Sequence, residues 1–112
     1  MEAALRAMAE PRRREILRLV WDAERSAGDI AEHFDVSRPA ISQHLRVLKE
    51  ADLVSERREG TRRFYRARPE TLEDLRNFLE RFWDESLAGL KREAEKDERR
   101  QRADRKNVQP HP

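Results

Sequence analysis

The stretch that decides the fold is DVSRPAISQHLRVL, residues 35–48, because it marks both the start of a helix and the division of its faces. Ser37 is a favourable N-cap residue, and Pro39 is tolerated in a first helical turn, where its missing N–H would have no partner. Apolar residues then recur at helical spacing, which predicts a helix from Ser37 to about Ala51. Its buried stripe consists of Ala40, Ile41, Leu45 and Leu48.

A shorter helix is predicted just before this one. Ser26 and Asp29 have the spacing of a capping box, and the apolar residues that follow predict a helix that ends near Phe34. The tight connection between this short helix and the longer one is the helix-turn-helix arrangement. Two further helices are predicted upstream, over residues 3–8 and 11–22.

Downstream of the long helix the sequence pattern changes from helical to alternating. Residues 53–58 and 62–67 both alternate, and Gly60 lies between them. The pattern predicts a β-hairpin that turns at Gly60 and ends at Pro69, which cannot continue a strand ladder. A basic hairpin after a helix-turn-helix makes the motif winged. The predicted fold class is therefore mainly α with a small β-hairpin, in the order α-α-α-α-β-β-α.

The last predicted helix has a wide apolar stripe. Thr71, with an acid three residues later, has the form of a capping box that opens this helix. Apolar residues almost disappear from Lys91 onward, so we expect the helix to fray there and the chain to be disordered beyond about Arg99. We accordingly divide the chain into one domain over residues 1–90 and a charged tail over residues 91–112. The stripe consists of Leu72, Leu75, Phe78, Leu79, Phe82, Trp83, Leu87 and Leu90.

The composition excludes several classes of protein. The chain has no cysteine, which removes disulfides, thiolate metal sites and thiol redox sensing. No stretch approaches the roughly 18 to 20 apolar residues of a membrane span, and residues 1–10 lack the apolar segment of a signal peptide. We therefore expect a cytoplasmic protein with no membrane partner. No nucleophile with an oriented base and no phosphate loop is recognisable, so we expect neither an enzyme nor a cofactor.

The charge is unevenly distributed along the chain. Residues 37–68 contain nine basic and four acidic residues, a net charge of +5, whereas the other 80 residues carry a net charge of −3. A localised basic segment fits contact with the phosphates of double-stranded DNA. In a winged motif the second helix enters the major groove, so contacts are expected from both helix and wing. The predicted DNA-binding residues are Ser37, Arg38, Pro39, Ser42, Gln43, His44, Arg46, Arg57, Arg62 and Arg63.

These residue types suit DNA in different ways. Gln can pair bidentately with adenine and Arg with guanine, whereas Ser and a helix N-terminus suit phosphates. Phosphate contact and helix packing are both open to His44. Arginines also protect exposed edge strands from aggregation, but a place beside the recognition helix favours minor-groove contact, with Arg62 as the first candidate.

The width of the apolar stripe on the last helix indicates a homodimer. A small winged helix cannot cover all of this stripe by itself, and a two-fold related copy would bury the remainder. The two recognition helices would then read half-sites of a palindrome about 34 to 36 Å apart. The predicted dimerisation residues are Leu5, Met8, Leu75, Phe78, Leu79, Phe82, Trp83 and Leu87.

The run from Ser37 to Leu48, with Leu53-Val54 and the Arg-rich turn at Gly60, resembles the ArsR/SmtB family of bacterial repressors. The resemblance covers roughly residues 3–90. It implies a homodimeric winged-helix repressor whose first and last helices form the dimer interface. It also implies a repressor that leaves its operator when an effector binds, although no effector is identified.

The family's metal sites have no counterpart in this sequence. Metal-sensing members carry Cys-Val-Cys where this chain has Ser26-Ala27-Gly28. A second family site uses His and carboxylate ligands on the last helix, and no His lies between Thr71 and Arg100. The resemblance therefore implies DNA binding and dimerisation without a metal site. The alternative is a winged helix that only binds protein, without specific DNA binding, but such a module would not need the basic segment.

Overall fold

The computed structural model describes the backbone of residues 1–107 and the side chains of residues 1–101. The last five residues of the predicted tail, 108–112, lie outside the described part. The fold is a winged helix-turn-helix, mainly helical with a small antiparallel sheet, as the sequence predicts. Its elements are α1 (Glu2–Met8), α2 (Pro11–Leu19), β1 (Arg25–Ser26), α3 (Ala27–Glu32), α4 (Arg38–Glu50), β2 (Val54–Glu59), β3 (Arg62–Ala67) and α5 (Pro69–Asn107).

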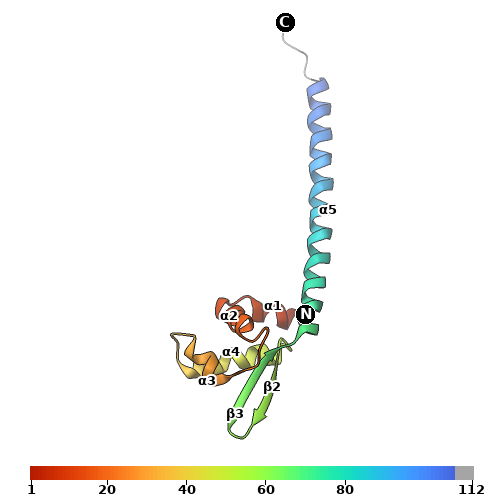
Figure 1. Cartoon of the computed structure of the whole chain (residues 1–112). Coiled ribbons are helices and arrows are strands. Elements are labelled where there is room, and N and C mark those ends of the chain that lie inside the picture. Colours follow the sequence, from red (N-terminus) through yellow and green to blue (C-terminus); the bar gives the residue numbers. More distant parts are fainter. Residues whose placement is uncertain (108–112) are drawn as a thin grey trace. The chain divides into compact units, whose positions relative to one another are not determined.

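The chain divides into two compact units, and the boundary in the sequence falls within α5. The first spans Met1–Arg76, and the second begins at Asn77. In the first unit, helices α1 to α4 lie together and the hairpin of β2 and β3 projects from them (Figure 1). In the part of the chain that the structure describes, no helix has both the length and the apolar character needed to cross a bilayer.

The two helices of the helix-turn-helix begin where the sequence predicts. The Ser26 hydroxyl accepts a hydrogen bond from the Asp29 N–H at 3.1 Å, and the Ser37 hydroxyl accepts one from the Ala40 N–H at 3.3 Å. Each cap satisfies a backbone donor that has no partner inside its helix, which fixes where the helix begins. Pro39 lies in the first turn of α4, as expected.

The sheet has three strands in the order β1-β3-β2. Strands β2 and β3 pair antiparallel with Arg57 opposite Phe64, and Gly60 at the turn has a φ of 60°. Strand β1, which the sequence analysis did not predict, pairs with β3 and places Arg25 opposite Tyr65. A strand of two residues is too short to show an alternating pattern.

One hydrophobic core holds the first unit together. Ile41, Leu45 and Leu48 of the predicted α4 stripe are 0 to 2% exposed, which leaves the other faces of α4 for solvent. Each fully buried aliphatic side chain stabilises the fold by about 1.5 to 3 kcal/mol relative to exposure. The other large side chains that are fully buried are Ile16, Leu17, Val20, Ile30, Leu53 and Val54.

Helix α2 ends earlier than predicted, at Leu19 rather than near Asp22. Val20 caps it, and the Val20 carbonyl accepts a hydrogen bond from the Ala67 N–H of β3 at 2.9 Å. This long-range bond turns the chain towards the sheet. Trp21, which the helical pattern had included, lies beyond the helix and is 54% exposed.

Helix α5 differs from the prediction at both ends. It begins at Pro69 rather than with a cap at Thr71, and the Leu72 N–H donates to the Arg68 carbonyl at 3.3 Å. Proline favours a first helical turn because its φ is already helical. The helix also continues to Asn107 instead of fraying after Lys91, because Ala, Glu, Lys and Arg favour helix even without apolar burial. The division into a domain over 1–90 and a tail over 91–112 stays a prediction.

Candidate nucleic-acid interface

The outer face of α4 presents the residues that the sequence analysis selected. Because the apolar stripe faces the core, polar side chains occupy the opposite surface of the helix. All six of the following residues are exposed: Ser37, Arg38, Pro39, Ser42, Gln43 and Arg46.

Two grooves lie where α4 faces the β2–β3 wing. One runs between the helix and the strands and is lined by Gln43, Arg46, Lys49, Arg58 and Arg63, among others. The second lies at the N-terminal end of α4, and there Arg38 and Ser42 of the helix face Arg62 and Arg63 of the wing. The fold therefore brings the predicted residues of helix and wing together on one surface.

Glu56, which the sequence analysis did not select, lies within this basic surface. Its side chain is 12% exposed and accepts a hydrogen bond from the Tyr65 hydroxyl at 3.0 Å. It also pairs with Lys49 of α4 at 3.5 Å and with Arg58 of β2 at 3.7 Å. Burial opposes ionisation, but the Tyr65 hydroxyl and the Lys49 ammonium hold the pKa of Glu56 below its usual value. Glu56 is therefore a carboxylate that joins helix and wing.

Arg57 lies in the wing as predicted, but its charge is already engaged. Its guanidinium contacts the Glu24 carboxylate at 2.6 Å and the Glu59 carboxylate at 2.8 Å. The guanidinium carbon also lies 4.7 Å from the centre of the Phe64 ring. The hydrogen bond from Arg57 lowers the pKa of Glu24, and the two acids raise the pKa of Arg57. The sequence pattern gives no signal for Glu24, because this residue lies 33 positions before Arg57.

The two arginines at the wing tip are less engaged. Arg62 and Arg63 are both exposed, and Arg62 lies 5.1 Å from the centre of the Phe64 ring. Within the described part of the chain, neither arginine forms an ion pair. The charge of Arg62 is therefore available to an external anion such as a phosphate, whereas Arg63 also interacts with Tyr65 and Glu56.

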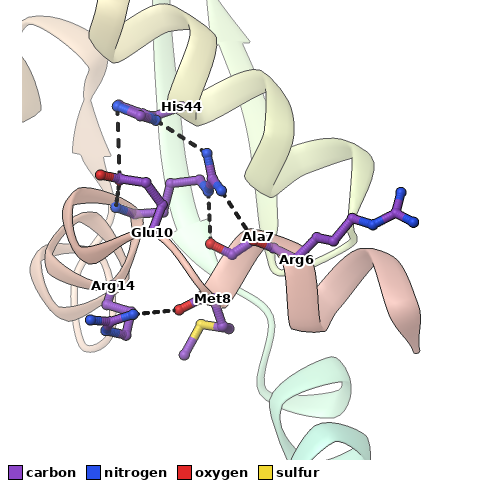
Figure 2. Close-up of polar contacts among 7 residues, drawn as sticks. Arg6, Ala7, Met8, Glu10, Arg14 and His44 are labelled. Carbon is purple, nitrogen blue, oxygen red and sulfur yellow. Dashed lines mark hydrogen bonds and ion pairs between the residues drawn. The ribbon is translucent and has the colours of Figure 1, made fainter.

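His44 is turned towards the junction of α1 and α2 (Figure 2). Its Nε2 lies 3.9 Å from Glu10, its Nδ1 lies 3.5 Å from Arg13, and its side chain is only 17% exposed. Arg13 in turn donates to the carbonyl groups of Ala7 at 2.7 Å and Arg6 at 3.0 Å, at the end of α1. Of the two roles open to His44, this placement favours helix packing.

The sequence and the fold agree closely with known regulators. Residues 10–56 match the family described as "Bacterial regulatory protein, arsR family". The HTH-type transcriptional regulator Rv2034 of Mycobacterium tuberculosis is 44% identical over 79% of this chain and 82% of its own length. The chain belongs to the ArsR family. The transcriptional repressor SdpR of Bacillus subtilis is 40% identical over 73% of this chain and 91% of its own length.

Solved structures agree with this assignment. The crystal structure of a possible transcriptional regulator for arsenical resistance is 47% identical, with a TM-score of 0.67 over 70% of this chain and 82% of that chain. The homodimeric winged helix-turn-helix DNA-binding domain Mb0332 of Mycobacterium bovis is 34% identical, with a TM-score of 0.60 over 75% of this chain and 78% of that chain. As an ArsR-family member, the chain is a DNA-binding transcriptional regulator and not an enzyme.

The predicted dimerisation residues of this ArsR-family chain differ in exposure. Leu5 and Met8 are partly buried against the core, and Leu75 is 5% exposed, which leaves it little surface for a partner. Phe78 is half-buried. The remaining four are 46 to 62% exposed and follow one another along α5: Leu79, Phe82, Trp83 and Leu87.

No group of three or more His, Cys, Asp or Glu residues in the described part of this ArsR-family chain is arranged to hold a metal ion.

Proposed function

We propose that this ArsR-family protein is a homodimeric repressor that binds a palindromic operator, with α4 in the major groove and the basic wing beside it. The observation that supports this proposal is the shared surface of α4 and the wing, where cations from both elements line the same two grooves. The proposed DNA-binding residues are Ser37, Arg38, Pro39, Ser42, Gln43, Arg46, Arg62 and Arg63. His44 and Arg57 support this surface through their contacts within the protein.

The dimer in this proposal forms through α1 and α5. The exposed apolar side chains of α5 are a surface that a second copy of the chain would bury. A two-fold axis places the two α4 helices about 34 to 36 Å apart, one turn of DNA, which matches the half-sites of a palindrome. The protein acts on DNA in the cytoplasm.

Binding of the full chain to the DNA upstream of its own gene tests the proposal. We expect fluorescence anisotropy to show a preference for this DNA over random DNA, together with steep loss of affinity as salt rises, because bound arginines release counterions. Equal affinity for both DNAs would instead favour the alternative, a winged helix that binds only protein.

Substitution of Gln43 tests which element reads bases. Gln43→Ala is expected to relax the preference at one base position and to cost about 1 to 3 kcal/mol, the range for a lost bidentate contact. Arg62→Ala is expected to weaken binding to all sequences alike and to reduce the salt dependence by about two counterions, one for each protomer of the dimer. The reverse result would exchange the roles of helix and wing.

A further inference from the structure

Glu24 lies on a part of the chain that is fixed against the sheet. It follows α2 and directly precedes β1, whose Arg25 pairs with Tyr65 of β3. The Arg25 Nε also donates a hydrogen bond to the Leu19 carbonyl at the end of α2, at 2.8 Å. The backbone at Glu24 is therefore anchored, because the next residue, Arg25, is bonded both to the end of α2 and to the central strand β3.

Arg57 meets this carboxylate as a fork. Its Nε donates to both Glu24 oxygens, at 3.2 and 3.1 Å, and its Nη2 donates to one of them at 2.6 Å. Its Nη1 donates to Glu59, two residues further along β2, at 2.8 Å. The planar guanidinium suits such bidentate pairing and is oriented by it. Each of its three nitrogens already contacts a carboxylate.

The contact continues from Arg57 to the wing tip through Phe64. Phe64 is the cross-strand partner of Arg57, and the guanidiniums of Arg57 and Arg62 lie 4.7 and 5.1 Å from the centre of its ring. Both distances lie within the range of cation–π attraction. The orientation of the Phe64 ring therefore bears on where Arg62 can lie.

We propose that Glu24 and Arg57 form a clamp that fixes the wing and, through the Phe64 ring, directs Arg62 towards DNA. In this arrangement Arg57 is a positioning residue and not a phosphate contact. The inference rests on the proposed function, because it concerns how the wing meets the operator. It goes beyond that function by assigning a role to Glu24, an acid outside the helix and the wing.

Charge argues against the simpler role for Arg57. To bind a phosphate, Arg57 would have to leave Glu24 and Glu59 and bring those two acids close to the DNA backbone. Arg62 needs no such exchange, because it forms no ion pair with any of the described residues. Exposed ion pairs add little to folding stability, so the benefit of the clamp lies in ordering the wing before DNA binds.

The two roles of Arg57 predict opposite effects of Glu24→Gln. If Glu24 only withholds Arg57 from a phosphate, this substitution frees Arg57 and strengthens operator binding. With the clamp, Glu24→Gln weakens operator binding by about five- to tenfold, because a long side chain must then be ordered on binding. Arg57→Gln weakens operator binding to a similar extent. The double variant binds the operator as tightly as the single variants do, because both substitutions break the same interaction.

Operator affinity of the full chain, measured by fluorescence anisotropy over a series of salt concentrations, distinguishes these roles. We expect Glu24→Gln and Arg57→Gln to leave the salt dependence unchanged, whereas Arg62→Ala lowers the log–log slope by about 1.8, because the dimer loses one phosphate contact from each protomer. Glu15→Gln is the matched control. It removes an acid from another exposed ion pair, with Arg18 on α2, and should leave operator affinity unchanged.

Hydrogen exchange of the free protein shows whether Glu24→Gln acts on the wing alone. The amides of β2 and β3 should exchange faster in this variant while those of α4 stay unchanged. Tighter operator binding by Glu24→Gln, additive effects of the two Gln variants, or unchanged exchange in the wing would each overturn the clamp alone. If the wild-type protein does not prefer the operator, both the proposed function and the aiming role of the clamp are wrong.

Discussion

Among individual side chains, Glu56 is the one that connects the two DNA-facing elements. It binds Tyr65 of β3, Lys49 of α4 and Arg58 of β2 through one carboxylate. An acid within a basic surface weakens long-range attraction to DNA, but it also orders the two cations that flank it. The Glu56 carboxylate thus orders the side chains of the groove but lowers the net positive charge of the basic surface.

Substitution of Glu56 has a pH dependence whose sign follows from its lowered pKa. Because the folded-state pKa lies below the unfolded value of 4.5, the carboxylate stabilises the fold above that pH and loses this effect as pH falls through the folded pKa. Glu56→Gln should lower the free energy of unfolding by about 1 kcal/mol at pH 7. We expect the difference from wild type to stay constant down to about pH 5 and to shrink below pH 4.5, as measured by urea denaturation.

Glu15→Gln, at an exposed pair, serves as the control for this experiment and should stay within about 0.5 kcal/mol of wild type at each pH. A deficit of Glu56→Gln that persists unchanged at pH 3.5 would mean that packing, and not the carboxylate charge, is responsible.

Sequence patterns identified the positions whose placement in the fold depends on local neighbours. The Ser37 cap and the outward face of α4 depend on neighbours within four positions, so spacing alone identifies them. Glu24 binds an arginine 33 positions away, and His44 contacts an arginine 31 positions away. Sequence patterns carry no signal for such pairs, because only the tertiary fold brings them together.

Among the elements, the hairpin depends on one backbone conformation. Gly60 has a φ of +60°, and a Cβ atom added there would meet nothing within 4 Å. Gly60→Ala is therefore free of clashes but strained, and we expect it to destabilise the protein by about 1 kcal/mol. Thermal unfolding measures the loss, and faster amide exchange in β2 and β3 would localise it to the wing.

Gly28→Ala in α3 is the matched control, because its Cβ would meet its nearest neighbour, Arg38, at an ordinary 3.6 Å without a positive φ. This variant should be as stable as wild type or slightly more stable, since alanine favours helix. Equal stability of Gly60→Ala and Gly28→Ala would show that the turn can adopt another conformation without cost.

The bounds of elements followed from the sequence only where a local signal existed. The capping serines placed the starts of α3 and α4 correctly, whereas the similar signal at Thr71 was overridden by Pro69, which begins α5 two residues earlier. The end of α2 was missed because a backbone hydrogen bond from Ala67 to the Val20 carbonyl fixes it across the fold. In α5 the apolar stripe predicted neither burial, since only Leu75 is buried, nor the length of the helix, which continues to Asn107.

At the scale of the whole molecule, the exposed apolar side chains of α5 are a surface that a monomer rarely leaves open. Leu79, Phe82, Trp83 and Leu87 are each at least 46% exposed. Together they are large enough to anchor an interface, since aromatic residues dominate the energetics of protein association. The proposed homodimer gives this surface a partner and sets the spacing of the two α4 helices.

The two tryptophans allow a test of this dimer with an internal control. Trp83 lies on the exposed stripe of α5 and is 62% exposed, whereas Trp21 lies after α2 and is 54% exposed. Trp83→Ser should weaken dimerisation by about 30-fold or more, the effect of losing an aromatic anchor worth about 2 kcal/mol. Trp21→Ser removes a side chain of the same type and similar exposure, and it should leave the dimer intact.

Light scattering over a dilution series measures the effect of each substitution, and fluorescence adds an independent readout. In the Trp21→Ser variant, the remaining Trp83 emission should shift to longer wavelength on dilution, because dissociation exposes the indole to water. In the Trp83→Ser variant, Trp21 emission should not change with concentration. A dimer that survives Trp83→Ser but is lost on Trp21→Ser would place the interface at the end of α2 and refute α5 as the dimerisation surface.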